Sequence, residues 1–408
     1  MKAPGIVIVG GSYAGLNAAM AARNAGYTAA ITLIGEESHL PYQRPPLSKD
    51  FLRGDLDTAQ LPLRPASYFE TAGIAVRTGT CVESIDRGAK IVRFSEGGTL
   101  SYDKLILATG CTPRLLEVEG GDAAGIHYLR TLDDALGIAA QLGSVNAVAV
   151  VGGGFIGLEI TASLRRMGKM VSVIEAQPRL LARTLSPEIA DYIADWHRRE
   201  GVQLRFDAQL ARIHSANGRV TGVEFADGDV VPADLVIVGI GVLPNMALAQ
   251  EADLQCANGI VVDEACRSSD PDIYAAGDCT WHPNAYAGGM MRLECVQNAI
   301  DQGKIAGANA AGRQVSYDVP PWYWSDQYEV KLQGVGIAAG HDHVVIRGNM
   351  EDHAFSAFYF AGEKLLAVES VNLPGEHMLA RKLLASNARL TARQAADTAY
   401  DLRQAIVK

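Results

Sequence analysis

The chain's 408 residues, 48% of them hydrophobic and 42 of them glycine, indicate two or three domains of a turn-rich α/β enzyme and exclude a disordered chain. Its 36 basic and 46 acidic residues give a formal net charge of −10, so the composition does not favour nucleic acid or an anionic membrane as a partner. No apolar run approaches the roughly 18 residues of a membrane span, and the first strand pattern begins too near Met1 for a signal peptide. We therefore expect a soluble, cytoplasmic protein.

A strand pattern over residues 5–9 leads into the glycine-rich turn Gly10-Gly11-Ser12-Tyr13-Ala14-Gly15, and a helix pattern continues to about Asn24. This order predicts a dinucleotide site in which the amino end of the helix faces the phosphates. Ser12 stands in the middle position, where glycine is usual, and serine fits there if its φ is negative. The fingerprint is weaker for this departure, but we expect the site to be intact.

A second strand pattern over residues 30–34 is followed by Glu36. Its expected role is to contact the ribose of an adenine dinucleotide that stays bound, with Glu37 as the nearby alternative. Prolines fix the loop that comes next, Pro41-Tyr42-Gln43-Arg44-Pro45-Pro46-Leu47-Ser48-Lys49. We expect Ser48 to start a short helix and Lys49 to be functional, with a solvated loop lysine as the alternative.

Two segments further along, residues 102–110 and 231–241, repeat one pattern. Each follows a glycine-containing hairpin, and each comes well after a glycine-rich turn. The repeat predicts two nucleotide-binding domains of one design, the second inserted into the first. The proline-bearing segments 112–114 and 243–245 are the expected crossovers between them.

The second glycine-rich turn follows a β-branched run, in Val148-Ala149-Val150-Val151-Gly152-Gly153-Gly154-Phe155-Ile156-Gly157-Leu158-Glu159. A helix pattern covers residues 158–168, and a strand pattern over 171–175 ends in Glu175. This acid would accept hydrogen bonds from the adenosine ribose and repel a 2′-phosphate, which favours NAD over NADP. Arg179 and Arg183 are the alternative, as phosphate ligands, and the position of Glu175 outweighs them.

Residues 268–278 predict a strand that ends in Gly277-Asp278. An acid at the carboxyl end of a parallel strand lies where a cofactor crevice opens, so we expect Asp278 to hydrogen-bond a cofactor hydroxyl. A helix pattern over 296–311 is expected to point its amino end at the same cofactor. Residues 317–408 differ in style and indicate a small antiparallel sheet with terminal helices and no catalytic motif of its own.

Together these patterns predict an α/β fold with two Rossmann-like dinucleotide-binding domains and a small α+β C-terminal domain. The predicted bounds are 1–111 and 244–316 for the first, discontinuous domain, 112–243 for the inserted domain, and 317–408 for the last.

Six motifs resemble one family across nearly the whole chain: residues 10–15, 44–49, 108–110, 152–159, 274–278 and 322–328. The family is the FAD-containing, NADH-dependent ferredoxin reductases that serve haem-thiolate monooxygenases and ring-hydroxylating dioxygenases, within the pyridine nucleotide-disulfide oxidoreductase superfamily. Residues 294–296 and 324–328 look nearer its putidaredoxin-reductase branch. The resemblance implies an FAD domain, an inserted NAD domain and a C-terminal interface domain.

The resemblance also assigns residues to each cofactor. The candidate FAD contacts are Gly10, Ser12, Tyr13, Ala14, Gly15, Glu36, Arg44, Lys49, Val82, Ala108, Thr109, Gly110, Arg130, Gly277, Asp278 and Val296. The candidate NAD contacts are Gly152, Gly154, Phe155, Ile156, Gly157, Glu159 and Glu175. Lys49 and Glu159 are the candidate catalytic pair beside the flavin, and only the family match indicates Val82 and Arg130, which otherwise look like strand core and surface charge.

The implied activity takes hydride from NADH onto bound FAD and passes electrons singly to a transiently docked 2Fe-2S ferredoxin, which serves a haem-thiolate monooxygenase as the terminal oxygenase. Alternatives are the reductase of a ring-hydroxylating dioxygenase, a rubredoxin reductase, an NADH oxidase, or a flavoprotein that acts through protein contacts, as apoptosis-inducing factors do. Trp324 is the candidate for lining the flavin edge, with an interdomain core aromatic as the alternative. The candidates for a basic docking patch are Arg292, Lys304, Arg313 and Lys331.

The cysteines separate this chain from relatives with thiol chemistry. They are Cys81, Cys111, Cys256, Cys266, Cys279 and Cys295. They form no Cys-x-x-Cys pair and no metal-ligand spacing, so we expect buried thiols and no metal site. Residues 35–52 contain no cysteine, which excludes the redox cysteine of disulfide reductases and NADH peroxidases at that loop. We expect no redox role for the two cysteines nearest the flavin contacts.

Overall fold

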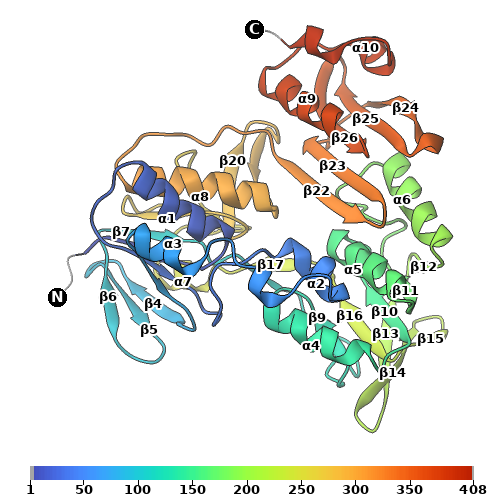
Figure 1. Cartoon of the computed structure of the whole chain (residues 1–408), viewed down its shortest axis with the longest axis horizontal. Coiled ribbons are helices and arrows are strands. Elements are labelled where there is room, and N and C mark those ends of the chain that lie inside the picture. Colours follow the sequence, from blue (N-terminus) through green and yellow to red (C-terminus); the bar gives the residue numbers. More distant parts are fainter. Residues whose placement is uncertain (1–3, 407–408) are drawn as a thin grey trace.

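The computed structural model describes residues 4–406, which build three five-stranded sheets with helices packed on them (Figure 1). In sequence order, the chain contributes four strands to the first sheet, then all the strands of the second sheet, then the last strand of the first sheet. The strands of the third sheet follow. None of the helices within the described residues is long and apolar enough to cross a membrane.

The first sheet is parallel, with the strand order β19-β7-β1-β2-β3. Its central strand β1, Ile6–Val9, is buried along its whole length because both faces of the sheet are covered. Ile6 and Ile8 pack toward helices, whereas Val7 and Val9 pack against an antiparallel sheet behind them. The other strands are β2 (Ile31–Ile34), β3 (Ile74–Arg77), β7 (Lys104–Leu107) and β19 (Ile273–Ala275), and the sheet behind is β4 (Val82–Asp86), β5 (Ile91–Phe94) and β6 (Thr99–Ser101).

Two helices lie side by side on the first sheet: α1, Tyr13–Asn24, and α8, Val296–Ala310. They approach closely because α8 carries glycine where α1 crosses it. A Cβ at Gly303 would lie 2.4 Å from the Ala14 carbonyl oxygen, and one at Gly307 would lie 2.0 Å from that of Ala18. This contact brings the amino ends of both helices to the same edge of the sheet.

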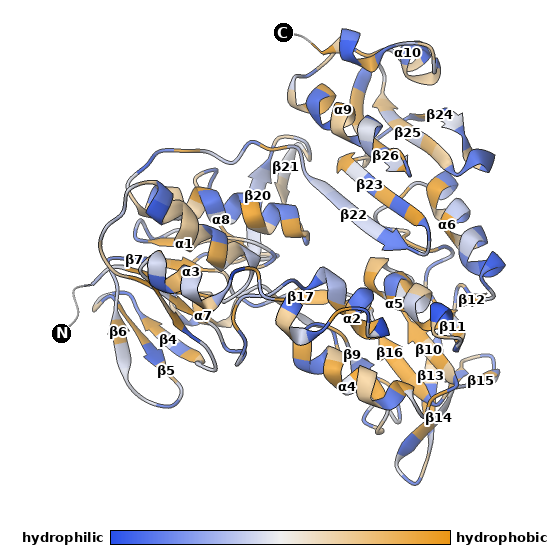
Figure 2. Cartoon of the chain, viewed as in Figure 1, coloured by the Kyte–Doolittle hydropathy of each residue, from blue (hydrophilic) through white to orange (hydrophobic). Residues whose placement is uncertain are grey.

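The second sheet repeats the parallel design, with the order β12-β11-β10-β16-β9. Its central strands are coloured as strongly hydrophobic in Figure 2, as buried parallel strands require. The strands are β9 (Ile126–Tyr128), β10 (Ala147–Val151), β11 (Met170–Ile174), β12 (Gln203–Arg205) and β16 (Leu235–Val238), and the helices are α4 (Leu132–Leu142), α5 (Phe155–Arg166) and α6 (Pro187–Arg199). A hairpin sheet of β13 (Leu210–Ala216), β14 (Arg219–Phe225) and β15 (Val230–Pro232) follows β12.

Two short strands carry the chain between the first and second sheets. They are β8, Cys111–Pro113, and β17, Val242–Pro244, and they pair antiparallel to each other. This ribbon lies where the sequence places the two crossovers. The exact domain bounds stay predictions.

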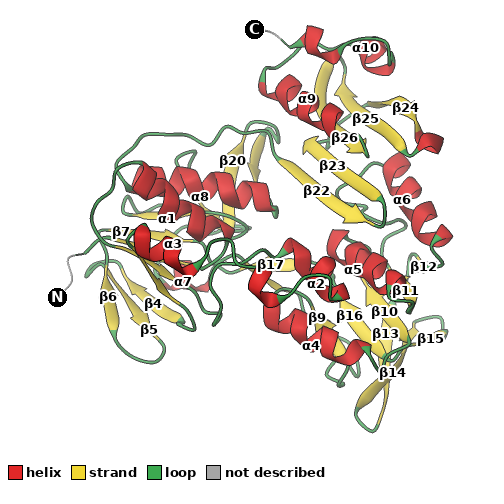
Figure 3. Cartoon of the chain, viewed as in Figure 1, coloured by secondary structure: helices red, strands yellow, loops and turns green. Residues whose placement is uncertain are grey.

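The third sheet is antiparallel, with the order β22-β23-β26-β25-β24, and helix α9, Pro374–Ala385, covers it (Figure 3). Its strands are β22 (Trp322–Gln327), β23 (Val330–Gly336), β24 (His343–Asn349), β25 (Ala354–Ala361) and β26 (Lys364–Val371). Apolar side chains of this sheet share one buried cluster with α5 and α6. The C-terminal domain therefore rests on the second nucleotide-binding domain.

The predicted fold class is confirmed: two parallel sheets of one design and a third, antiparallel sheet. Two local predictions are wrong. Ser48 does not start a helix; it ends the 3₁₀ turn Pro45–Ser48, and Lys49 precedes α2, Asp50–Arg53. The helix after the second glycine turn begins at Phe155 rather than Leu158, because the turn is completed by Gly154.

Candidate functional site

The first glycine turn is built by backbone contacts that leave no room for side chains. Gly10 has φ +120°, and a Cβ there would lie 2.0 Å from the Ala108 carbonyl oxygen. Ser12 has φ −127°, as the sequence requires of a serine at that position, and its side chain does not cap α1. The first amides of α1, from Tyr13 on, are thus left available to a phosphate, as in dinucleotide sites.

Three segments meet at this turn. A Cβ at Gly277, just after β19, would lie 3.2 Å from the Ala14 side chain and 3.6 Å from that of Ala299. Helix α8 begins nearby at Val296, also without a side-chain cap. Two uncapped helix ends and the end of a parallel strand therefore converge, which is the arrangement that binds a dinucleotide with two phosphates.

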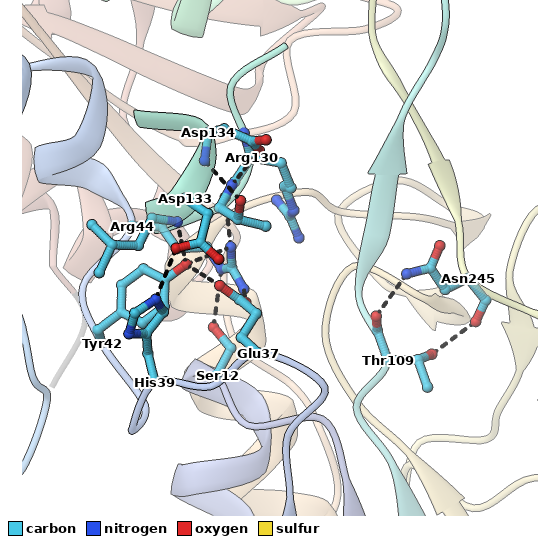
Figure 4. Close-up of polar contacts among 12 residues, drawn as sticks. Ser12, Glu37, His39, Tyr42, Arg44, Thr109, Arg130, Asp133, Asp134 and Asn245 are labelled. Atoms are coloured by element: carbon cyan, nitrogen blue, oxygen red, sulfur yellow. Dashed lines mark hydrogen bonds and ion pairs between the residues drawn. The ribbon is translucent and has the colours of Figure 1, made fainter. Parts of the chain in front are cut away.

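Arg44 ties the proline loop to the first turn (Figure 4). Its guanidinium is 2.6 Å from a Glu37 carboxylate oxygen, donates to the Arg130 carbonyl oxygen over 2.5 Å, and lies 3.4 Å from Ser12 Oγ. Tyr42 donates to the other oxygen of Glu37. Because Glu37 is held in this way, Glu36 is the better candidate for the ribose: it is exposed and bonds to no described side chain.

Arg130 and Asp278 form an ion pair at 3.2 Å, with both side chains largely buried. Cys111 donates its thiol to the same Asp278 oxygen. The guanidinium of Arg130 also approaches Gly110, where a Cβ would be 3.2 Å away. The structure therefore places Arg130, which the sequence pattern alone did not indicate, beside two residues that it did.

Residues 108–110 end β7 and lead into the crossover. Thr109 donates from Oγ1 to the Asn245 carbonyl oxygen over 2.7 Å, and Asn245 returns a bond from Nδ2 to the Thr109 carbonyl over 2.9 Å (Figure 4). Ala108 is buried against Gly10. Val82 lies in the hydrophobic cluster behind the first sheet and is 7% exposed, so its side chain belongs to the core, and a cofactor contact there stays a prediction.

The second glycine turn has nearly the same backbone as the first. Gly152 has φ +111°, and its Cβ would lie 2.3 Å from the Gly239 carbonyl oxygen; one at Gly157 would lie 2.3 Å from that of Gly152. Gly154, by contrast, faces open space, and Ile156 is 48% exposed. The Phe155 ring packs on Tyr323 of the C-terminal sheet, with 5.3 Å between ring centroids.

Glu175 lies against the second turn. One carboxylate oxygen accepts the Gly153 amide over 2.7 Å, and the other accepts the Gln177 amide over 2.8 Å. Each oxygen keeps a second lone pair for a ribose hydroxyl. Arg179, the alternative group, donates to carbonyls of its own loop instead.

Lys49 and Glu159 meet between the two turns. Lys49 Nζ is 2.5 Å from Glu159 Oε2, and the two side chains are 13% and 4% exposed. Lys49 belongs to the loop of the first domain, and Glu159 lies on α5, two residues after Gly157. The pair therefore joins the two candidate nucleotide sites.

Two serines that the sequence analysis did not assign to the site complete the contacts of Glu159. Ser48 donates to Oε2 over 2.7 Å, and Ser325 of β22 donates to Oε1 over 2.8 Å. A signal was present for Ser325, because Ser325 and Gln327 alternate along a strand and so share a face with Tyr323. Nothing local in the sequence shows which carboxylate that face meets.

Buried polar atoms on α8 fit a polar cofactor at the first site. Gln302 is fully buried and accepts the Gly277 amide over 2.8 Å, while its Nε2 finds no partner among the described residues. The Oδ1 atom of Asn298, one turn earlier, is likewise buried and unpaired there. Unpaired buried polar groups are costly, so groups on a bound dinucleotide are the partners that these residues suit.

Trp324 packs on Trp322, with the two rings tilted by 37° to each other, and it is partly buried. It belongs to none of the hydrophobic clusters within residues 4–406. This weakens the alternative that it is an interdomain core aromatic.

The basic docking patch stays a prediction, and the structure gives less support to two of its four members. Arg292 is 13% exposed and paired with Glu294, and Arg313 bonds to the Ala25 carbonyl at the far ends of α1 and α8. Lys304 is 55% exposed beside Asp301, and Lys331 is exposed on β23.

The cysteines offer no reactive pair. All six are free. Burial raises the pKa of the Cys295 thiol to about 12 and also raises that of Cys279, which keeps both protonated and weakly nucleophilic.

Comparison with known proteins finds matches over nearly the whole chain. Residues 4–303 match the family described as pyridine nucleotide-disulphide oxidoreductase, and residues 322–406 match the family described as reductase C-terminal. Rhodocoxin reductase of Rhodococcus erythropolis is 46% identical over 403 residues, covering 99% of this chain and 94% of that protein. A rubredoxin-NAD(+) reductase of Pseudomonas putida is 41% identical over 369 residues, covering 90% and 96%.

A solved structure is similar over the same extent. The ferredoxin reductase for the CYP199A2 system of Rhodopseudomonas palustris superimposes with a TM-score of 0.97 at 41% identity, covering 99% of this chain and 100% of that one. All three sheets therefore have counterparts in one known protein.

Proposed function

The chain belongs to the pyridine nucleotide-disulphide oxidoreductase family, whose members bind FAD and use NAD(P)H, and from this we propose that it is an FAD-containing, NADH-dependent ferredoxin reductase. The observation that carries the proposal is the contact between Lys49 and Glu159 at 2.5 Å. It joins the loop of one glycine-turn domain to the helix of the other, so the two dinucleotides that the turns suit would meet there.

The residues divide the work between two cofactors. The first turn, Arg44, Arg130, Asp278 and the amino end of α8 would hold FAD, and the second turn with Glu175 would hold NADH. Bound FAD supplies the chemistry, by accepting a hydride and releasing electrons one at a time. The chain aligns the reactants and excludes water: Lys49 presents a charge in a site where its partner Glu159 is 3% exposed.

The proposed electron acceptor is a 2Fe-2S ferredoxin that serves a haem-thiolate monooxygenase. The similar protein from Rhodopseudomonas palustris is a ferredoxin reductase for a CYP system, and its chain aligns along its full length. The 41% identity to a rubredoxin-NAD(+) reductase makes rubredoxin reduction the second candidate. We also propose a cytoplasmic location, because NADH is an intracellular reductant.

Stopped-flow spectroscopy tests this assignment. The purified chain with FAD is first reduced by NADH, then mixed with a 2Fe-2S ferredoxin, with a rubredoxin, or with oxygen alone. Reoxidation of the flavin that is fast with the ferredoxin and slow with the other two is the expected result. Faster reoxidation by rubredoxin supports the second candidate, and failure to take up FAD or to react with NADH overturns both.

A further inference from the structure

A chain of buried hydrogen bonds runs from the second nucleotide-binding domain through the C-terminal sheet to Glu159. We propose that Ser325, Gln327 and His197 are positioning residues, whose donors all point toward Glu159 and hold its carboxylate, ionised and oriented, against Lys49. The contacts do not depend on the proposed function; their kinetic consequence does.

The row of hydrogen bonds from His197 to Glu159 is unbroken. Ser325 Oγ donates to Glu159 Oε1 over 2.8 Å, and Gln327 Nε2 donates to Ser325 Oγ over 3.0 Å. His197 Nε2 lies 2.9 Å from Gln327 Oε1. All four residues are buried, with whole-residue exposures of 3% for Glu159, 0% for Ser325, 2% for Gln327 and 1% for His197.

The direction of each bond follows from the carboxylate. Lys49 and Ser48 donate to Oε2, and a carboxylate that accepts an ammonium is ionised and accepts only. The Ser325 hydroxyl must then donate its only proton to Oε1. Its oxygen is left as an acceptor, so the Gln327 amide must turn its NH₂ toward Ser325 and its oxygen toward His197.

The histidine tautomer is fixed in turn. Gln327 Oε1 accepts, so His197 must carry its proton on Nε2, and Nδ1 must be unprotonated. Burial lowers the pKa of His197 to about 4, so the ring is neutral near pH 7 and has one proton to give. The Tyr328 hydroxyl, 3.5 Å from Nδ1, is the donor on that side.

These hydrogen bonds connect three parts of the fold to the carboxylate of Glu159. His197 lies on α6, Ser325 and Gln327 lie on β22, and Ser48 and Lys49 lie on the proline loop. The seating of the C-terminal sheet on the second domain thereby sets where Glu159 points. Neither Ser325 nor Gln327 belongs to a glycine turn, so their loss should act on the rate of reduction rather than on NADH binding.

The experiment compares Ser325→Ala, Ser325→Thr and a control, Ser356→Ala. Ser356 is equally buried in the same sheet and also donates to a glutamate, Glu376, over 2.7 Å. It makes no hydrogen bond to Glu159, Ser325, Gln327 or His197. For Ser325→Ala we expect flavin reduction at saturating NADH to slow about tenfold, with KM changed less than about twofold. Threonine keeps the hydroxyl and should restore most of the rate, and the control should match the wild type.

A second measurement is independent of turnover. In protein labelled with ¹⁵N-histidine, the His197 ring, identified by its loss in His197→Asn, should show the Nε2-protonated neutral form between pH 6 and 8. The Ser325→Ala variant should shift that ring and leave the other histidines unchanged. A ring protonated on Nδ1, or on both nitrogens, overturns the proposal even if the wild type proves inactive with NADH. In an active enzyme, equal rates for Ser325→Ala and Ser356→Ala overturn it as well.

Discussion

The two glycine turns share a backbone but differ in what covers them. Gly10 and Gly152 have φ values of +120° and +111°, and each packs its α-carbon on the carbonyl of a neighbouring strand end. Over the first turn lie Arg44 and the amino end of α8, and Ala14 is 6% exposed there. At the second turn, Ile156 holds the position that Ala14 has in the first, and it is 48% exposed.

Under the proposed function, this difference in covering would separate a resident FAD at the first turn from a dissociable NADH at the second. Arg44, Arg130 and Asp278 come from segments far apart in the chain and close around the first turn, so release from it requires several contacts to open. The second turn keeps Gly154 in open space and is bordered by Tyr323 on one side. We therefore propose that the residues covering each turn, rather than the geometry of the turn itself, set how long a dinucleotide stays bound there.

The largest effect should come from Gly10→Ala beside its counterpart Gly152→Ala. Both add a Cβ within 2.3 Å of a backbone oxygen, at a φ that only glycine adopts easily. We expect Gly10→Ala to be expressed without bound flavin or not folded, and Gly152→Ala to keep its flavin but to lose saturation by NADH. Absorbance at 450 nm and NADH titration measure the two outcomes.

Gly154→Ala is the matched control. No heavy atom lies within 4 Å of its Cβ position, and its φ is −82°. Its melting temperature should fall only slightly, because alanine meets no clash there and is only a poorer N-cap of α5 than glycine. If Gly152→Ala also loses its flavin, the two turns are not separable in the way that their covering indicates.

The next effect concerns Glu369, a buried carboxyl at the border of the second site. Glu369 accepts from the hydroxyl of Tyr323, whose ring packs on Phe155, and burial raises the pKa of Glu369 from 4.5 to about 7. Between these pH values the folded protein keeps a proton that the unfolded chain has lost. Stability should therefore fall by about 3 kcal/mol as pH rises through that window, and stay level above it.

Glu369→Gln should remove this dependence. The variant should gain stability relative to the wild type between pH 5 and pH 8, as measured by the difference between their melting temperatures at each pH. The exposed Glu363→Gln provides the control, and it should follow the wild type at both pH values. If the difference between the melting temperatures of Glu369→Gln and the wild type is the same at pH 5 and pH 8, the pKa of Glu369 is not raised by burial. The first site is bordered instead by ion pairs such as that of Arg130 with Asp278.

Local patterns predicted both turns because their causes are local. A β-branched run, glycines at positive φ and an apolar helix period lie within about 20 residues of one another, and β1, α1 and β2 begin or end within a residue or two of their predicted bounds. The contacts that complete the site are not local. Ser48 and Ser325 reach Glu159 across 111 and 166 positions, and Arg44 reaches Arg130 across 86. These depend on how separate domains pack, and only family resemblance indicated Glu159 and Arg130.

A smaller effect is expected from Glu175→Gln at the second turn. Gln retains one acceptor oxygen for the two amides that Glu175 now binds and loses the charge that opposes a 2′-phosphate. The KM for NADH should rise roughly tenfold, consistent with loss of a hydrogen bond to a charged group. The ratio of kcat/KM for NADH to that for NADPH should become smaller. Steady-state kinetics with both nucleotides measure this, with the exposed Glu83→Gln as control. An unchanged preference would remove Glu175 from nucleotide selection.

The smallest effect should come from exchanging the middle residues of the turns, Ser12→Gly and Gly154→Ser. Ser12 makes no capping bond, and its Oγ has one long contact, 3.4 Å, to Arg44, so Ser12→Gly should change flavin affinity less than about twofold. Gly154 has φ −82° and ψ 176°, a backbone suited to a serine cap of α5. Gly154→Ser should therefore stabilise the fold by a few tenths of a kcal/mol, seen as a slightly higher melting temperature. It should also raise the KM for NADH a few-fold, because the new hydroxyl competes with the pyrophosphate for the same amides. If Gly154→Ser binds NADH as tightly as the wild type, the amides of α5 do not hold the pyrophosphate.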